Sequence, residues 1–191
     1  HYGLTDKGKT RTRRPSAAEQ AAICQWFREH PEYDIPLEDI VNVLCQSIMR
    51  RGEIFRITWD DLAEKARGVW VRDRKHPRKK KGNDEFVLLV GTSWDIIQRQ
   101  PNRKPAEPRI FPYNPGTVSK YFKWACDANG IVDLHLHDCK REATSSLADL
   151  GLTPQEITAA GGPKKWEVQQ RYTELEPAKL SAKIINLKTG T

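Results

Sequence analysis

The chain has 191 residues, of which 38% are hydrophobic and 30% charged, with a formal net charge of +7 and an isoelectric point near 9.3. This length and hydrophobic fraction predict a single compact domain. The sequence has no apolar run of about 18 residues, and its polar, basic start lacks the apolar segment of a secretory signal, so we expect neither a membrane span nor a signal peptide. The positive charge favours attraction to a polyanion.

The four cysteines are scattered along the chain and form no Cys-x-x-Cys pair. This spacing argues against a zinc site and against a disulfide framework. A reducing cytosol is the simplest compartment, so we expect a cytoplasmic protein.

The first half of the chain predicts an arm followed by two helices. Residues 1–15 are basic and almost without apolar side chains, which predicts a linker or arm. Ser16-Ala17-Ala18-Glu19 matches a capping box and predicts a helix that ends at Pro31. A second helix is predicted to begin near Pro36, and a short helical turn to follow Arg51-Gly52.

The second half predicts a hairpin and then further helices. Residues 68–75 and 84–90 have the composition of strands, and the basic, turn-forming residues 76–83 between them predict a hairpin tip. Helices are predicted at 92–99, 117–129, 138–150 and 153–160, the last from a capping box with proline at its first position. The predicted fold class is therefore mainly α with a small antiparallel β-sheet (α+β).

Three polar segments, residues 49–54, 136–145 and 162–175, could together carry chemistry on a phosphodiester. Such a reaction needs a nucleophile, cations on the non-bridging oxygens and an acid for the leaving oxygen. Tyrosine has a pKa of about 10 and must be activated by neighbouring groups. The guanidinium fork fits a phosphate, whereas a lysine is the better proton donor. A set of Arg, Lys, His and Tyr without acidic metal ligands predicts metal-free phosphoryl transfer and no cofactor.

In this order and at these separations, the three segments resemble the active-site boxes of the tyrosine recombinases, the phage-integrase family. Arg50-Arg51-Gly52-Glu53-Ile54, followed by Trp59-Asp60-Asp61, is similar to the family's first box. The resemblance implies that Arg50 binds the scissile phosphate and that Glu53 supports it, with Arg51 on the DNA. The alternative is an exposed arginine pair that Glu53 bridges locally.

The hairpin and the second box supply the next implied residues. The resemblance implies that Lys75, expected at the end of the first strand, protonates the leaving 5′-oxygen. The family's second box reads His-Asp-Leu-Arg-His, and here His137 opens it while Lys140 stands where the second arginine belongs. Lysine keeps the charge but loses the fork, so we expect a rate lower by roughly 10²–10³. The other basic residues of these segments are expected to contact DNA, namely Arg78, Lys79, Lys80, Lys81 and Arg141. The alternative to Lys75 as the acid is one of the three hairpin lysines, Lys79 to Lys81.

The third box departs from the family at a second position. The family has a histidine after the glycine, whereas this chain has Pro163 after Gly162. We expect Lys164 and Lys165 to lie near DNA phosphates. By resemblance Tyr172 is the nucleophile that forms a 3′-phosphotyrosyl bond. The alternative is a half-buried helical tyrosine with a hydrogen-bonded hydroxyl.

The resemblance implies a site-specific recombinase that acts on double-stranded DNA as a tetramer, in a bacterial or phage-infected cell. It implies an arm at 1–15, a catalytic domain at 16–176 and a C-terminal helix at 177–191 that docks on a neighbouring protomer. An N-terminal core-binding domain that the family normally has is expected to be missing. The alternatives are a DNA-binding module of the same fold weakened or inactivated by Lys140 and Pro163, and a type IB topoisomerase-like enzyme.

Overall fold

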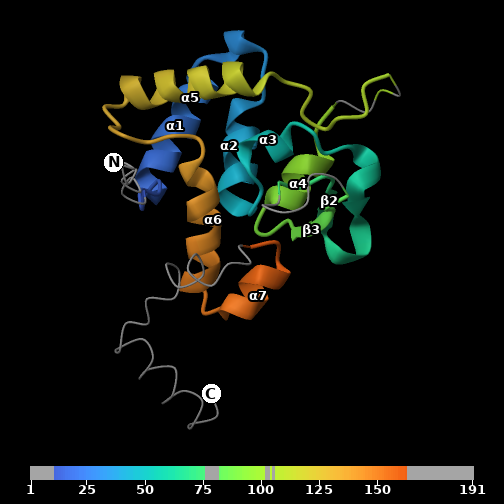
Figure 1. Cartoon of the computed structure of the whole chain (residues 1–191). Helices are drawn as coiled ribbons and strands as arrows, with labels where there is room; N and C mark the ends of the chain where they lie inside the picture. Colours follow the sequence, from blue (N-terminus) through green and yellow to red (C-terminus); the bar gives the residue numbers. More distant parts are fainter. Residues whose placement is uncertain (1–10, 76–81, 102–103, 105, 163–191) are drawn as a thin grey trace, which may run out of the picture.

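The computed structural model describes residues 11–75, 82–101, 104 and 106–162 (Figure 1). Several predictions fall outside the described residues, namely those for Arg78, Lys79–Lys81, Pro163, Lys164, Lys165, Tyr172 and the C-terminal helix. The helices are α1 (Ala17–Glu29), α2 (Leu37–Gln46), α3 (Arg51–Ile54), α4 (Ser93–Gln98), α5 (Pro115–Ala128), α6 (Asp138–Asp149) and α7 (Pro154–Ala159). The strands are β1 (Leu62–Ala63), β2 (Gly68–Val71) and β3 (Glu85–Leu88).

The helix starts follow from side chains that cap the free backbone amides. At α1 the Ser16 hydroxyl accepts from the Glu19 amide at 3.2 Å, while the Glu19 carboxylate accepts from the Ser16 amide at 2.8 Å. The capping box predicted at Thr153 is likewise present at α7. α5 begins two residues earlier than predicted, because Asn114 caps it and Pro115 fits its first turn.

The sheet is three-stranded and antiparallel in the order β1-β2-β3. The predicted hairpin is present as β2 and β3, in which Val69 pairs with Val87 and Trp70 with Phe86. The two-residue β1 was not predicted. β2, the first strand of the predicted hairpin, is shorter than expected, because the chain turns after Val71 with Asp73 at a φ of 44°. Lys75 therefore lies beyond this turn and not at the end of the strand.

α2 is the central helix of the core. It packs against α1, α4 and α6, and α5 covers α1 (Figure 1). A second, smaller apolar cluster attaches α7 to α6 and consists of Ile48, Leu147, Ile157 and Ala160. Among the described residues, no helix is long and apolar enough to cross a membrane.

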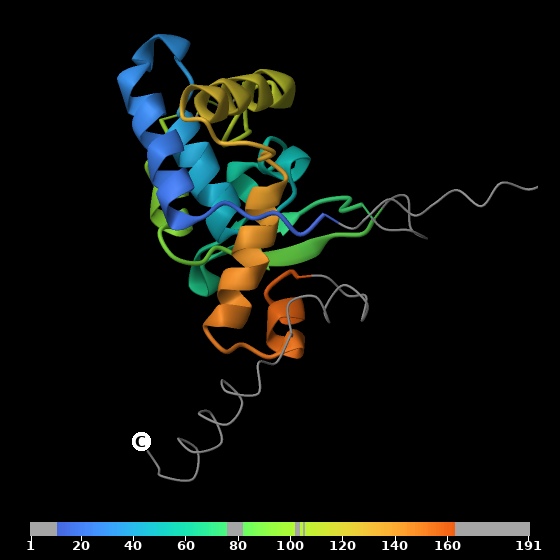
Figure 2. The same ribbon diagram turned by 90° about the vertical axis from the view of Figure 1, so that its left-hand side faces the viewer.

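The described part of the predicted arm packs on the domain. The segment that precedes α1 runs across α6 (Figure 2). Arg14 Nε donates to Glu142 Oε2 at 2.7 Å, and Arg14 Nη2 donates to Asp149 Oδ2 at 2.9 Å. Two ion pairs with one helix thus fix the direction of this segment.

Candidate functional site

Arg50 and Glu53 form the first part of the site, at the start of α3. The Arg50 amide donates to Glu53 Oε2 at 2.7 Å, and Arg50 Nη1 donates to Glu53 Oε1 at 2.6 Å. The Glu53 side chain is 2% exposed, whereas that of Arg50 is 38% exposed. A buried carboxylate therefore holds an arginine whose guanidinium still reaches solvent. The ion pair between Arg50 and Glu53 is thus present, and the exposed part of the Arg50 guanidinium can still bind an anion.

Arg74 is the second partner of Glu53 and is itself buried. Its Nε donates to Glu53 Oε1 at 3.2 Å, and its Nη1 donates to Glu85 Oε2 at 3.0 Å. Burial alone would raise the pKa of Glu53, but the charge of Arg74, together with the hydrogen bonds and charge of Arg50, lowers it. Glu53 is thus held ionised between two guanidinium groups.

Lys140, in the first turn of α6, interacts electrostatically with the same cluster. Its side chain is half-buried. Burial, and then the positive charges of Arg50 and Arg74, lower the pKa of Lys140 to about 7, against the opposing influence of Glu53 and Glu85. α6 therefore brings Lys140 to the group around Glu53, where it adds a titratable cation beside Arg50.

His137 precedes α6 and is exposed. Partial desolvation, followed by the charges of Lys140 and Arg141, lowers the pKa of His137 below its usual value. The charge of Arg50 acts in the same direction, so His137 belongs to the same electrostatic group. A neutral imidazole is favoured at neutral pH, and it can accept or donate a hydrogen bond.

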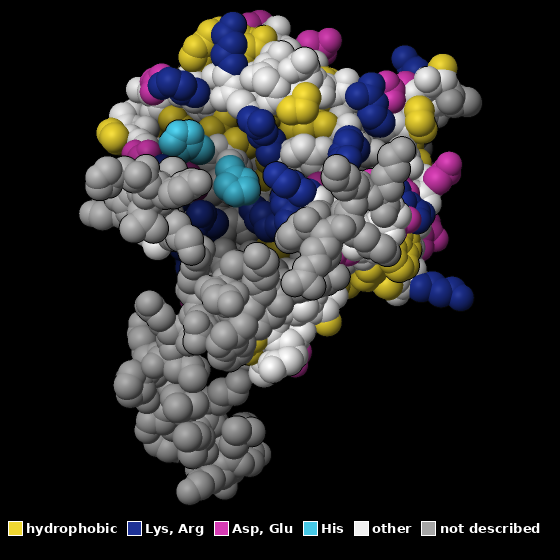
Figure 3. All heavy atoms as spheres, viewed as in Figure 1, with side chains coloured by type: hydrophobic (Ala, Val, Ile, Leu, Met, Phe, Trp, Pro, Cys, Tyr) yellow, Lys and Arg dark blue, Asp and Glu magenta, His cyan; other side chains and the backbone are white. Residues whose placement is uncertain are grey.

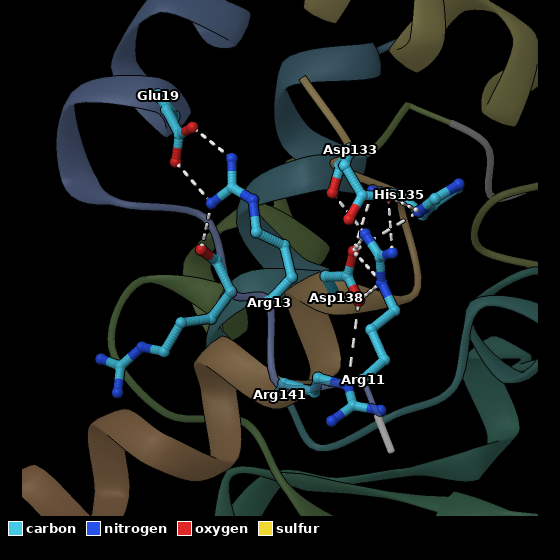
Figure 4. A network of polar contacts seen from close by, with 8 residues as sticks. Arg11, Arg13, Glu19, Asp133, His135, Asp138 and Arg141 are labelled. Atoms are coloured by element: carbon cyan, nitrogen blue, oxygen red, sulfur yellow. Dashed lines mark hydrogen bonds and ion pairs between the residues drawn. The ribbon is translucent and has the colours of Figure 1, made fainter. Parts of the chain in front are cut away.

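Arg141 turns toward a different partner, Asp138. Arg141 Nε is buried, lies 3.8 Å from Asp138 Oδ1 and has no hydrogen-bond partner among the described residues. In Figure 4 the side chains of Arg11 and Arg141 both approach the Asp138 carboxylate. Neighbouring residues on α6 therefore divide between two groups, with Lys140 at the Glu53 cluster and Arg141 at Asp138.

Asp138 is fully buried and is held by Arg11 (Figure 4). Arg11 Nε donates to Asp138 Oδ1 at 2.9 Å, and Arg11 Nη2 donates to Asp138 Oδ2 at 2.8 Å. Burial opposes ionisation, but the hydrogen bonds from Arg11 and from the His135 amide lower the pKa of Asp138. Arg11 also pairs with Asp133 at 2.7 Å. The arm thereby anchors the start of the helix that carries Lys140.

The other predicted residues lie around this centre. Arg51 is exposed and donates to Ser119 Oγ on α5 at 2.8 Å. A groove of about 640 Å³ separates α5 from the chain before α6, and Arg51 and His137 both line it. Lys75 is exposed and follows Arg74 directly.

The face seen in Figure 3 has histidine side chains beside a group of lysine and arginine side chains. Within the part of the chain that the structure describes, no group of three or more His, Cys, Asp or Glu side chains could hold a metal ion. The described geometry supplies cations and an imidazole, which suit an anionic phosphate.

Arg74 is the site residue that the sequence did not reveal. It is one of seven lysine and arginine residues between Arg72 and Lys81, and the sequence alone predicts solvent exposure for all of them. Only the packing separates Arg74, which is 3% exposed, from Arg72, which is 55% exposed. The sequence places Arg74 directly before the predicted catalytic Lys75, but this position does not indicate whether the Arg74 side chain is buried.

The sequence and the fold of this chain are similar to those of known proteins. A model of the phage integrase family matches residues 19–179. The shufflon-specific DNA recombinase of Escherichia coli is 27% identical over 180 residues, which cover 91% of this chain and 43% of the recombinase. The chain spans less than half the length of the curated relatives it matches.

Solved structures share the fold. The Tn1549 transposon integrase, in complex with transposon right end DNA, has a TM-score of 0.72 at 15% identity, covering 97% of this chain and 68% of that one. A lambda integrase tetramer bound to a Holliday junction has a TM-score of 0.64 at 17% identity, covering 88% of this chain and 50% of that one. The predicted mainly α fold with a small antiparallel sheet is confirmed.

Proposed function

The chain belongs to the phage integrase family, and from this premise we propose that it is the catalytic domain of a site-specific DNA recombinase. Its reaction cleaves and rejoins double-stranded DNA through a 3′-phosphotyrosyl intermediate. The observation that carries the proposal is the shared cluster of Arg50, Glu53 and Lys140. One buried carboxylate there orients an accessible guanidinium next to a second cation.

The proposed chemistry conserves the energy of the phosphodiester bond. The Tyr172 hydroxyl loses its proton to solvent as its oxygen attacks the scissile phosphorus. The bond from phosphorus to the 5′-oxygen breaks, and Lys75 gives that oxygen a proton. Arg50, Lys140 and His137 stabilise the charge that develops on the phosphate. The reverse attack by a 5′-hydroxyl rejoins a strand and releases Tyr172. Neither a nucleotide cofactor nor a metal ion takes part in these steps.

The proposed partners are double-stranded DNA and further copies of the protein. Strand exchange between two DNA sites needs four active sites, and the lambda integrase structure is a tetramer on a Holliday junction. We also propose that the complete recombinase has a core-binding domain that closes a clamp on DNA. Arg51, which is proposed to contact DNA, and His137, which is proposed to act on the scissile phosphate, both line the groove beside α5.

Two residues are proposed to weaken the reaction. Lys140 takes the place of an arginine and lacks its planar pair of donors. Pro163 takes the place of a histidine and offers no donor or proton.

A specific observation favours a second candidate function, a DNA-binding module with little catalysis. The pKa of Lys140 is about 7, so this cation is only partly charged at neutral pH.

Covalent trapping on DNA tests the proposal. The protein, joined to its core-binding domain where its gene encodes one, is incubated with nicked duplex DNA from beside that gene, and adducts are separated on a denaturing gel. We expect an adduct that Tyr172→Phe abolishes. Lys140→Arg should accelerate its formation by roughly 10²–10³ because the fork is restored.

The two candidate functions give different results in this assay. Salt-sensitive DNA binding without an adduct, in the parent and in Lys140→Arg alike, would support the DNA-binding module. An adduct that persists in Tyr172→Phe would show that another side chain is the nucleophile. Tyr121→Phe is the matched control, because Tyr121 stacks on Tyr33 with ring centroids 4.3 Å apart and should not affect cleavage.

A further inference from the structure

Arg74 joins four segments that are distant in the sequence. Besides its ion pairs to Glu53 and Glu85, its Nη1 donates to the Gly161 carbonyl at 2.7 Å and its Nη2 to the Ile48 carbonyl at 2.9 Å. The side chain is 3% exposed. It therefore connects the chain before α3, α3 itself, β3 and the end of α7 through one guanidinium group.

These contacts use the particular shape of arginine. A guanidinium has five N–H donors in a fixed plane, and Nε, Nη1 and Nη2 of Arg74 are all engaged. A lysine ammonium has three donors on a flexible stem and cannot span the same four acceptors. A neutral side chain at this position would leave Glu53 with one cation fewer in a buried environment, which is costly.

The junction that Arg74 closes is the exit of α7. The Leu88 amide on β3 donates to the Ala160 carbonyl at 3.2 Å. Gly161 has a φ of 98°, and a Cβ there would lie 2.8 Å from Val87 Cγ2. Backbone, glycine and Arg74 thus hold the end of α7 against β3. The chain leaves this junction at Gly162 toward the segment that contains Tyr172.

We propose that Arg74 is a positioning residue that fixes the exit of α7 relative to the Arg50–Glu53 pair, and so sets where the segment bearing Tyr172 begins. The inference rests on the proposed function for the role of Tyr172. Arg74 itself touches no substrate in this scheme. It acts through Glu53 on one side and through the Gly161 carbonyl on the other.

Hydrogen exchange tests the junction without any need for activity. In Arg74→Gln, amide exchange in peptides covering residues 85–89 and 157–162 should accelerate about tenfold or more, because local opening becomes easier. Arg72→Gln is the matched control, since Arg72 lies on the same hairpin and pairs with Asp61 and Asp84, but its side chain is 55% exposed and these hydrogen bonds do not reach the end of α7. Unchanged exchange in Arg74→Gln, or equal acceleration in both variants, would overturn the proposal.

Covalent trapping tests the consequence for the reaction. At saturating DNA, Arg74→Gln should form the adduct about 10²-fold more slowly, because small displacements of a reacting group have effects of this size. Its affinity for DNA should stay within about twofold of the parent, since no phosphate contact is lost. A merely structural role would lower the amount of folded protein and not the rate per bound complex.

A DNA substrate with sulfur in place of the bridging 5′-oxygen separates two kinds of positioning. The thiolate leaves without an acid, so this substrate should restore cleavage by Lys75→Ala. It should not restore cleavage by Arg74→Gln if Arg74 positions Tyr172. Restoration in Arg74→Gln would overturn the proposal, because it would show that Arg74 acts by positioning Lys75.

The design also separates this inference from the proposed function. If neither the parent nor Lys140→Arg forms an adduct, the proposed function fails, and hydrogen exchange alone decides whether Arg74 holds the junction. If Arg74→Gln does not fold, Arg74→Lys goes through the same measurements. It keeps the charge beside Glu53 but loses the planar fork, so exchange at 157–162 should still accelerate, and unchanged exchange would overturn the proposal.

Discussion

Lys140 is a cation whose charge depends on its surroundings, unlike the arginines near it. Burial and the charges of Arg50 and Arg74 lower its pKa to about 7, while Glu53 and Glu85 act in the opposite direction. An arginine at this position would stay charged over the whole physiological range. A lysine there can therefore make phosphate binding sensitive to pH, in addition to removing one hydrogen bond.

This difference predicts a pH profile specific to Lys140. The pKa in the folded protein is lowered, so Lys140 is charged below about 7 and neutral above it. Relative to Lys140→Arg, the parent should lose adduct formation as the pH rises through this range. Bound phosphate favours the charged form, so the midpoint on DNA should lie higher than in the free protein.

The measurement is the ratio of the two adduct rates between about pH 5.5 and 9. The ratio removes contributions that the two proteins share, such as the ionisation of the nucleophile Tyr172. Lys140→Met, which carries no charge at any pH, should be slow throughout and show no such step. Parallel profiles for the parent and Lys140→Arg would refute a role for the titration of Lys140.

At the scale of elements, α6 links the arm to the site. Its first turn carries Lys140, and it packs on the central helix α2. The arm follows α6, with Arg11 at Asp138 near its start and Arg14 at Glu142 further along. Residues predicted to form a linker therefore also help to position the helix of the second box.

Removing the Arg11 guanidinium should destabilise the start of α6. In Arg11→Gln, the buried carboxylate of Asp138 loses its main cation, so the melting temperature at neutral pH should fall. The fall should exceed that in Arg13→Gln, because Arg13 pairs with Glu19 within its own segment and both side chains are partly exposed.

The pH dependence of stability gives a second check on Arg11. The pKa of Asp138 is lowered in the folded protein, so its pairing stabilises above the unfolded pKa and is lost as the pH falls through the folded value. The difference between the parent and Arg11→Gln should therefore be complete at neutral pH and shrink below about pH 4. The measurement is the melting temperature of the parent and of both variants across this pH range. Equal decreases in Arg11→Gln and Arg13→Gln would contradict the anchoring role of Arg11.

At the scale of the whole molecule, the net charge of +7 and the grouping of basic side chains on one face favour DNA binding that depends on salt. Each phosphate contact contributes about −0.9 to the slope of log affinity against log salt concentration. If Lys79 and Lys80 both contact phosphates, replacing both by glutamine should make the slope shallower by about 1.8.

A matched pair of lysines controls for net charge. Lys65 and Lys104 line a separate groove beside β1, and replacing both by glutamine removes the same charge. Titrations at several salt concentrations should leave the slope of this control unchanged. Equal slopes for the two double variants would show that the hairpin lysines do not meet the DNA backbone.

The sequence by itself determined the class of fold and the order of the boxes. Capping residues such as Ser16 and Thr153 and the turn residues of the hairpin act locally, so the helices and the hairpin were predictable to within a few residues. The short strand β1 was not, because two residues carry no periodicity and pair only through a neighbouring strand. The strand end after Val71 was missed because a turn at Asp73 is not marked by glycine or proline.

The roles within the site depended on tertiary structure to different degrees. Spacing placed Arg50, Glu53 and Lys140 in boxes of the family, and the fold brings them to one cluster. The assignments of Lys75, His137 and Tyr172 to steps of the reaction remain predictions. Only packing decided that Lys140 interacts with the charges around Glu53 while Arg141 lies beside Asp138, and that Arg74 is buried. Burial and charge pairing arise between segments far apart in the sequence, so no local pattern could specify them.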